Sequence, residues 1–240
     1  MAVSNIFNID DWKPRTELGK KVKNREINDL GEILDKGHRI LEPEIIDVLL
    51  PNLEVQLLEV GQSKGKFGGG KGSIWKQTQK KTSEGNRIKF SAFAVVGNKD
   101  GYVGVGFGSS KETVPAREKA TRKAKLNIIK IRRACGSWDC DCRTPHSIPF
   151  KVSGKCGSVR VTLMAAPRGT GLKAERKCRV LLGLAGIKDV YAKTKGQTAT
   201  KLNFFIACFN ALKQLSKIKL NEDFVKEAGV VEGTTSKLEV

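Results

Sequence analysis

The strongest constraint on the fold of this chain is a change of hydrophobic period near its middle. Apolar residues alternate with other residues over Ile88–Val96, which is the period of a β-strand. Residues 97–101, GNKDG, are a strong turn signal, and residues 102–107 supply a return strand. Over residues 112–131 the spacing becomes helical, with alanines on one face and basic residues on the other. The segment therefore predicts a strand, a hairpin turn, a second strand and a basic helix.

Electrostatic charge is distributed very unevenly along the chain. Residues 1–60 carry −4, residues 61–133 carry +14 and residues 134–240 carry +9, which gives +19 in total. Repulsion among so many positive charges does not stabilise an isolated protein. Binding to a polyanion neutralises these charges and is favoured by the release of counterions. The charge therefore predicts a nucleic-acid partner, with residues 61–133 as the main contact surface.

The second half of the chain predicts another compact unit with the order β-α-β-α. Residues 159–163 alternate as a strand, residues 176–185 have helical spacing before a capping glycine, and residues 187–192 form a short strand. A final amphipathic helix is expected over residues 201–215. Its inward side chains are expected to be Leu202, Phe205, Ile206, Phe209 and Leu212. The polar tail after Lys217 is expected to be partly disordered.

Two regions of the first half show no core of their own. The first region is the mildly acidic segment 1–54, in which apolar spacing favours short helices at residues 27–34 and 44–50. We interpret this segment as an arm that packs on its own domain or on a neighbour. Residues 61–73 are rich in glycine and lysine and should be mobile unless a partner orders them. Their GKFGGGKG run nearly matches a phosphate-binding loop. Glycine stands where Ser or Thr would ligate magnesium, however, so no nucleotide is expected.

Glycines at positions 104, 106 and 108 interrupt the return strand. The run is too short for a dinucleotide-binding fingerprint, and it follows a hairpin instead of opening a helix. Glycine within a strand lets another backbone approach closely. We therefore interpret this run as a site of tight backbone packing.

Three cysteines and one histidine lie close together in the sequence. They are Cys135, Cys140, Cys142 and His146. Zinc accepts this ligand set in a tetrahedral site, and a connector without its own core gains stability from one structural zinc. The spacing is not that of a common zinc finger, so the alternative is an ordinary set of reduced cysteines. The remaining thiols are interpreted as small core residues, at Cys156, Cys178 and Cys208.

Catalytic and membrane functions find little support in the sequence. Two histidines are present, and no serine, histidine and acid stand at a suggestive spacing, so no catalytic residue is predicted. No stretch approaches the roughly 20 apolar residues of a membrane span, and the N-terminus does not resemble a signal peptide. Six cysteines without a secretion signal indicate reduced thiols or metal ligands. The sequence thus indicates a non-enzymatic, cytoplasmic protein.

One long motif closely resembles the small-subunit ribosomal protein family number five in its archaeal and eukaryotic form. It is RRACGSWDCDCRTPHSIPFKVSGKCGSVRVTLMAAPRGTG, at residues 132–171. Further segments are similar to the family in the correct order: DWKPRTELGKKVKN, EPEIIDVLLP, FSAFAVVGNKDGYVGVGFGSSKE and LAGIKDVYAKTKGQTATKLNFF. The cysteines make the chain most like archaeal members. The resemblance implies an α+β fold, in which a double-stranded-RNA-binding-like domain precedes a β-α-β-α two-layer sandwich.

Under this resemblance the chain divides into five parts. These are an N-terminal extension (1–54), a double-stranded-RNA-binding-like domain (55–133) with a basic glycine-rich loop (61–75), a Cys/His connector (134–146), the β-α-β-α domain (147–216) and a tail (217–240). The resemblance implies a structural role on the small ribosomal subunit near the messenger entry channel, with support for translation accuracy. The alternative is an RNA chaperone or passive messenger-unwinding factor that acts with the ribosome.

The resemblance also implies partners and contact residues. Partners would be small-subunit ribosomal RNA, messenger RNA at the entry channel and neighbouring small-subunit proteins, without homo-oligomers. The resemblance carries over RNA contacts to Lys80, Lys81, Arg87, Lys89, Asn98, Lys99, Tyr102, Arg132, Arg133 and Arg168. The basic charge of residues 61–133 adds the candidates Lys64, Lys66, Lys71 and Lys76, of which the first three lie in a glycine-rich insert, residues 61–75, that departs from the family. Residues 173–176 depart from the smaller, more apolar pattern of the family, so no shared role is assigned to that helix start.

Overall fold

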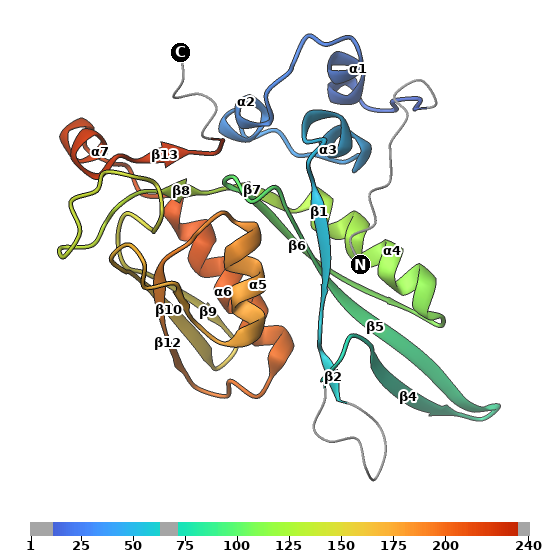
Figure 1. Cartoon of the computed structure of the whole chain (residues 1–240). Coiled ribbons are helices and arrows are strands. Elements are labelled where there is room, and N and C mark those ends of the chain that lie inside the picture. Colours follow the sequence, from blue (N-terminus) through green and yellow to red (C-terminus); the bar gives the residue numbers. More distant parts are fainter. Residues whose placement is uncertain (1–11, 63–71, 235–240) are drawn as a thin grey trace. The chain divides into compact units, whose positions relative to one another are not determined.

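The fold is given by a computed structural model that describes residues 12–62 and 72–234, and it divides into two compact units (Figure 1). The first unit contains residues up to 96 and residues 104–128, and the second contains residues 97–103 and the chain from residue 129. Each unit is built on a β-sheet with helices packed against it. No helix among the described residues is long and apolar enough to cross a membrane.

Three short helices precede the first sheet: α1 (Glu17–Lys23), α2 (Leu30–Asp35) and α3 (Glu44–Leu49). The Thr16 hydroxyl caps α1 by accepting the Gly19 N–H at 3.1 Å. Glu42 accepts the N–H groups of Arg15 at 2.9 Å and Thr16 at 2.6 Å. Burial acts to raise the pKa of Glu42, but these hydrogen bonds outweigh it and lower the pKa. The sequence predicted α2 and α3 but missed α1, whose start is tied down by this distant carboxylate.

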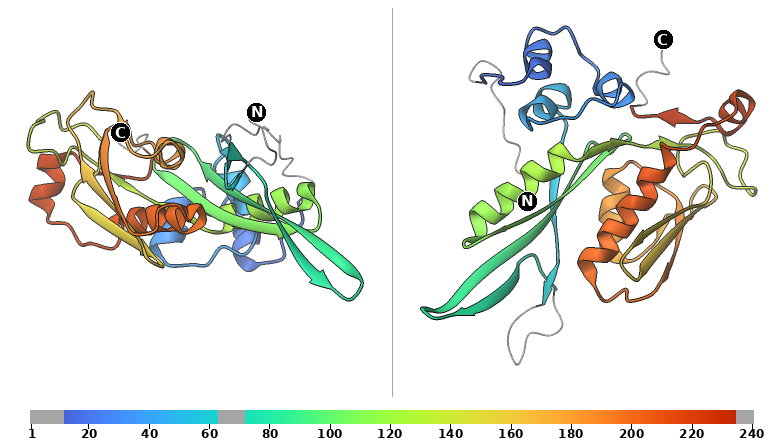
Figure 2. Two further views of the ribbon diagram at one scale, coloured as in Figure 1. Left: turned by 90° about the horizontal axis from the view of Figure 1, so that it is seen from below. Right: turned by 180° about the vertical axis from the view of Figure 1, so that it is seen from behind.

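The first sheet has five strands and contains a long antiparallel hairpin. Its strands are β1 (Glu54–Leu58), β4 (Lys76–Thr82), β5 (Gly85–Gly97), β6 (Tyr102–Ser110) and β7 (Ile128–Lys130). The order is β1-β5-β6-β7, and β4 pairs with the outer half of β5. Figure 2 shows the β4–β5 hairpin extending beyond the rest of its sheet. A small ladder joins β2 (Gly61–Gln62) to β3 (Gly72–Ser73).

Helix α4 (Thr113–Leu126) packs on β6 with almost no space between the two backbones. A Cβ atom on Gly106 would lie 2.2 Å from the Ala120 carbonyl oxygen and 2.3 Å from the Ala124 nitrogen. Gly104 and Gly108 meet the same helix equally closely. Alanines on the facing side of α4 are fully buried. The glycine run therefore serves tight backbone packing, as the sequence predicted.

Helix α4 is shorter than the helical pattern over residues 112–131 predicted. It ends at Leu126, and the Asn127 N–H caps it by donating to the Lys123 carbonyl at 3.1 Å. The Asn127 side chain donates from Nδ2 to the Val105 carbonyl of β6 at 3.2 Å, which ties the helix end to the sheet. The β-branched residues that follow join the sheet as β7 instead of extending the helix. Local spacing could not tell whether residues 128–130 continue the helix or form a strand, because either element would bury the same apolar side chains.

The second unit is a four-stranded sheet covered by two helices. Its strands are β9 (Val152–Cys156), β10 (Val159–Ala165), β11 (Leu172–Lys173) and β12 (Val190–Lys195), and its helices are α5 (Arg176–Leu184) and α6 (Lys201–Leu215). The order is β11-β12-β10-β9, with β10 antiparallel to both neighbours and β11 parallel to β12. Val161 and Leu163 on β10 are buried beneath the helices. The predicted β-α-β-α order holds, with β9 and β11 added to it.

Two expectations for the second unit are corrected by the structure. Leu202 and Ile206 of α6 are only half-buried, whereas Phe204 and Cys208 are buried in their place. The tail expected to be partly disordered contains α7 (Glu222–Ala228) and β13 (Val231–Glu232), and β13 pairs with β8 (Arg132–Arg133). Glu232 forms ion pairs with Lys130, at 3.3 Å, and with Arg132. Within the described part of the tail, up to residue 234, β13 is therefore held in place by distant basic residues that the composition of the tail does not reveal.

Candidate nucleic-acid interface and metal site

The four residues predicted as metal ligands converge in the structure. One ligand atom from each of Cys135, Cys140, Cys142 and His146 lies within 4.8 Å of the others. His146 Nε2 is 3.9 Å from Cys140 Sγ. Ligand atoms of a tetrahedral zinc site are about 3.3–3.8 Å apart, given bonds of about 2.0–2.3 Å. The donor set and its spacing therefore fit one metal ion after a small contraction of the loop.

A buried carboxylate holds the histidine of this cluster in a fixed orientation. Asp189 Oδ2 is 2.8 Å from His146 Nδ1, and both side chains are buried. The other oxygen of Asp189 accepts the Gly171 N–H at 2.7 Å. A carboxylate on the far nitrogen is the usual outer partner of a metal-binding histidine, because it leaves Nε2 free to bind the metal. The sequence analysis missed Asp189, since it lies 43 residues from His146.

The cysteines of the cluster differ in acidity. Burial raises the pKa of Cys135 to about 11, and hydrogen bonds with Cys142 and Cys140 add to this effect. For Cys142, slight burial acts to raise the pKa, but hydrogen bonds from Thr144, Cys140 and Cys135 outweigh it and lower the pKa to about 6. In the metal-free protein, the negative charge is therefore concentrated on Cys142.

Alkylation tests this difference directly. In metal-free protein at pH 7, we expect iodoacetamide to label Cys142 before Cys135, because the thiolate is the reactive form. Labelling of Cys142 should rise with pH around a midpoint near 6. Peptide mass spectrometry reads out each site. Equal labelling rates at the two cysteines would contradict the assignment, and added zinc should protect both.

Basic side chains line one face of the β4–β5 hairpin. Lys80 stands directly opposite Arg87. Alternate residues of a strand share a face, so Lys76 on β4 and Lys89 on β5 lie on the same face as this pair. All of these side chains are exposed, as is Lys81 on the other face. Arg87 also pairs with Glu84 at 2.6 Å. Like charges placed opposite each other destabilise a hairpin, so this face is suited to a polyanion.

The candidate residues at the β5–β6 turn have mainly structural contacts. Asn98 Oδ1 accepts the N–H groups of Asp100 at 2.8 Å and Tyr102 at 3.1 Å, which closes the turn. Tyr102 is buried, whereas Lys99 is exposed at the tip with a φ of 59°. The Lys99 N–H donates to the Leu184 carbonyl at 2.9 Å, so this turn is fixed to the end of α5.

Arg132 and Arg133 are partnered by protein groups. Arg132 contacts Glu232 and the Ile218 carbonyl. Arg133 is 4% exposed, and it donates to Asp100 at 2.6 Å and to the Gly233 carbonyl at 2.8 Å. Arg168 is exposed in the turn before β11. Lys64, Lys66 and Lys71, with most of the glycine-rich loop, lie outside the described residues.

Three of the predicted RNA-binding residues meet at one cavity of the second unit. Its volume is about 430 Å³, and four basic side chains line it: Arg133 from β8, and Lys99, Arg168 and Lys188 from three loops. Two carboxylates also line the cavity, but each has a partner: Asp100 accepts a hydrogen bond from Arg133, and Asp189 is hydrogen-bonded to His146. The Nε of Arg133 is buried without a hydrogen-bond partner. Its four basic side chains outnumber its two carboxylates, so the basic cavity has the net positive charge that an anion requires.

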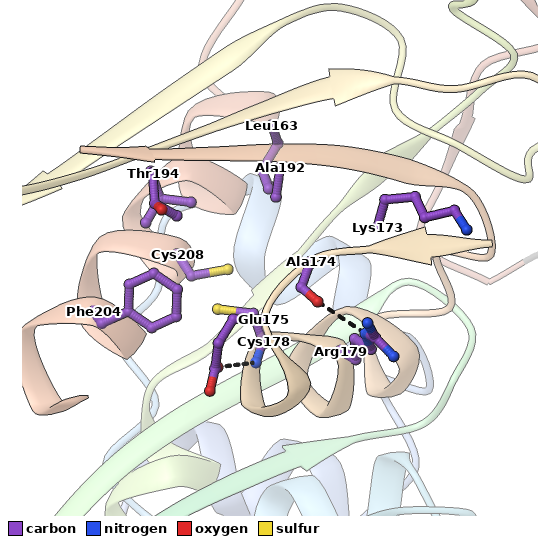
Figure 3. Close-up of a pocket in the computed structure, with 11 residues that line it drawn as sticks. Leu163, Lys173, Ala174, Glu175, Cys178, Arg179, Ala192, Thr194, Phe204 and Cys208 are labelled. Carbon is purple, nitrogen blue, oxygen red and sulfur yellow. Dashed lines mark hydrogen bonds between the residues drawn. The ribbon is translucent and has the colours of Figure 1, made fainter. Parts of the chain in front are cut away.

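A second cavity, of about 260 Å³, lies between α5, α6 and the sheet (Figure 3). Cys178 and Cys208 point into it from the two helices and are buried, as predicted for core residues, whereas Cys156 is half-buried. Glu175 caps α5 by accepting the Cys178 N–H at 3.3 Å. A hydrogen bond with Cys208, together with burial, raises the pKa of Cys178, so this thiol is neutral and unreactive.

Comparison with known proteins gives the class and then the family. Residues 74–132 match the N-terminal domain of ribosomal protein S5, and residues 154–226 match its C-terminal domain. The first of these is the double-stranded-RNA-binding-like domain of an α+β ribosomal protein, as the sequence predicted. Small ribosomal subunit protein uS5 of Nanoarchaeum equitans is 49% identical over 95% of this chain and 98% of its own length. Its namesake in Methanocaldococcus jannaschii is 48% identical, with the same coverage.

The chain therefore belongs to the small ribosomal subunit protein uS5 family. Another relative, from Methanococcus maripaludis, is 47% identical over 97% of this chain and 96% of its own length. Membership of this ribosomal protein family confirms the expectation that the chain is not an enzyme.

Proposed function

We propose that this chain is a structural component of the small ribosomal subunit that binds ribosomal RNA near the messenger entry channel. Family membership and the chain's +19 charge support the assembly with ribosomal RNA. Messenger RNA and neighbouring small-subunit proteins are its further proposed partners, in the cytoplasm and without self-association. Support for translation accuracy follows from that location.

The observation that carries this proposal is the basic face of the β4–β5 hairpin. Lys80 and Arg87 oppose each other there, with Lys76 and Lys89 alongside. Phosphate groups would neutralise these positive charges, remove the repulsion between them and release counterions. RNA binding therefore stabilises the hairpin. In this proposal Lys76, Lys80, Lys81, Arg87 and Lys89 all contact the RNA backbone, which positions the protein without reading base sequence.

The basic cavity is the proposed second phosphate site. Lys99 and Arg168, together with Lys188, supply exposed positive charge at its rim. Asn98 and Tyr102 would act by shaping the turn that carries Lys99, and Arg133 by holding that turn through Asp100. Arg132, Lys64, Lys66 and Lys71 remain predicted contacts.

Neutralising the hairpin face tests the RNA contact. In the fourfold variant Lys76→Gln, Lys80→Gln, Arg87→Gln and Lys89→Gln, the dependence of log K on log salt should weaken by about three to four units. Fluorescence anisotropy with a ribosomal RNA fragment, over a series of salt concentrations, measures this slope. Thermal stability should be unchanged or slightly higher, because repulsion on the hairpin is removed.

A matched control removes charge elsewhere. The variant Lys213→Gln, Lys226→Gln changes two exposed lysines outside the proposed interface and should leave the slope nearly unaltered. A decrease in the control variant of half that in the hairpin variant, that is, the same decrease per charge removed, would show that binding follows net charge alone. Sedimentation of the wild-type chain free of small subunits would overturn the proposed function. Strand separation by the free protein without ATP would instead favour an RNA chaperone.

We also propose that the Cys/His cluster binds one structural zinc ion. The ligand set of three thiolates and an imidazole, together with the outer carboxylate of Asp189, supports zinc over harder cations. Elemental analysis of the purified protein should give one zinc per chain, and the variant Cys140→Ser, Cys142→Ser should contain little. Equal zinc content in the two proteins would exclude the site.

A further inference from the structure

Trp138 is the most exposed large apolar side chain among the residues that the structure describes. It is 97% exposed, while Val114 follows at 63%. A tryptophan this exposed adds nothing to the core, and Trp is one of the residues enriched at the energetic hot spots of protein interfaces. Neither the RNA contacts nor the metal site uses it.

The loop that carries Trp138 is fixed at its base. Ala134 pairs with Ser147, and the Cys135 N–H donates to the Ala228 carbonyl at 3.0 Å. The Cys140 N–H donates to the Ser137 carbonyl at 3.4 Å, which places Trp138 within a tight turn. The turn lies between two cysteines of the metal cluster. The backbone that carries the indole is therefore anchored, so docking would not have to order this loop.

The charge around the indole is negative, in contrast to the rest of this basic chain. Asp139 and Asp141 are exposed in the same loop, and residues 134–142 contain no lysine or arginine. Arg143 is 3.8 Å from Asp141 but is itself largely exposed. Three thiolates around a doubly charged metal would add a further net negative charge. Phosphate groups would be repelled here, so an RNA base stacked on the indole is disfavoured.

We propose that Trp138, Asp139 and Asp141 form a docking site for a lysine- or arginine-rich segment of another protein. An indole face attracts a guanidinium or ammonium group by a cation–π contact, and two flanking carboxylates can pair with further basic side chains. The chain thus has separate surfaces for two partner classes: basic surfaces for RNA, and this acidic aromatic site for a basic protein. The inference rests on the proposed assembly into the small subunit, where such a neighbour is expected.

Photo-crosslinking from position 138 within assembled small subunits tests this directly. The variant Trp138→p-benzoylphenylalanine keeps an exposed aromatic side chain and is expected to crosslink to a lysine- or arginine-rich protein segment, identified by peptide mass spectrometry. The matched control Tyr191→p-benzoylphenylalanine places the probe at another exposed aromatic position. Crosslinks from position 138 to RNA, or none in subunits that contain the variant, would overturn the proposal.

Truncation gives a second, quantitative readout. The variant Trp138→Ala should fold normally, because the indole is solvent-exposed, and its contact with the crosslinked neighbour should weaken by about thirtyfold. Asp139→Asn with Asp141→Asn should weaken the same contact while leaving the indole in place. Unchanged affinity in both variants refutes the docking site. A wild-type chain that never enters small subunits refutes the proposed function instead.

Discussion

Removal of the metal from the Cys/His cluster is expected to lower the midpoint of thermal unfolding by about 8–16 °C. A ligand present at a thousandfold excess over its dissociation constant stabilises the folded state by about 4 kcal/mol. For a chain of this size, each kcal/mol shifts the midpoint by about 2–4 °C. The cluster joins two distant parts of the second unit, since His146 is bonded to Asp189 and Cys135 to Ala228.

Circular dichroism with and without a strong zinc chelator measures this effect. The variant Cys140→Ser, Cys142→Ser should unfold at the lower temperature in either condition, because it retains too few ligands. Cys156→Ser is the matched control, since Cys156 is half-buried and lies outside the cluster. Its response to the chelator should equal that of the wild type. A wild-type protein insensitive to the chelator would contradict a structural metal.

Replacing Gly106 with valine is expected to destabilise the first unit by about 3 kcal/mol or more. The added Cβ would overlap backbone atoms of Ala120 and Ala124 at 2.2–2.3 Å, and backbone in a helix cannot move aside as a flexible side chain can. Helix α4 would have to separate from β6, which would open the buried alanine face to water. Urea unfolding, followed by circular dichroism, measures the loss of unfolding free energy.

Gly183→Ala is the control for a glycine that needs no space. Gly183 lies within α5, and a Cβ there would meet no atom within 4 Å. This change should be neutral or stabilise the protein by about 0.5–1 kcal/mol, because alanine favours the helix. If Gly106→Val were equally harmless, the close approach of α4 and β6 would be wrong.

The strands and helices that the sequence predicted correctly are those with a strong local pattern. Alternation over Ile88–Val96 and the GNKDG turn match β5, the turn and β6, and the spacing over residues 201–215 matches α6. Strand β4 was missed because its residues, KQTQKKT, show no apolar alternation. It forms because β5 is 13 residues long and its first part, residues 85–91, offers backbone groups with which β4 pairs.

The residues of the candidate metal site and of the basic cavity also divide into those with a local sequence signal and those without one. Cys135, Cys140, Cys142 and His146 were predicted because ligand types stand close together in the sequence, and the structure confirms that they converge. Lys188 and Asp189 were missed, because nothing in their local sequence marks them. They become part of the site only when the start of β12 is folded against the metal loop and the Arg168 turn.

By itself, the sequence determined the family of this protein, its two α+β domains, its expected RNA partner and the residues of its candidate metal site. Each of these depends on residue type and short-range spacing, which are properties of the linear chain. Only the tertiary structure decided that Arg133 is buried beside Asp100 while Lys80 faces Arg87 in solvent, and that Trp138 is held out from an anchored loop. Burial and pairing depend on which distant backbone lies alongside, and residue order alone does not state that.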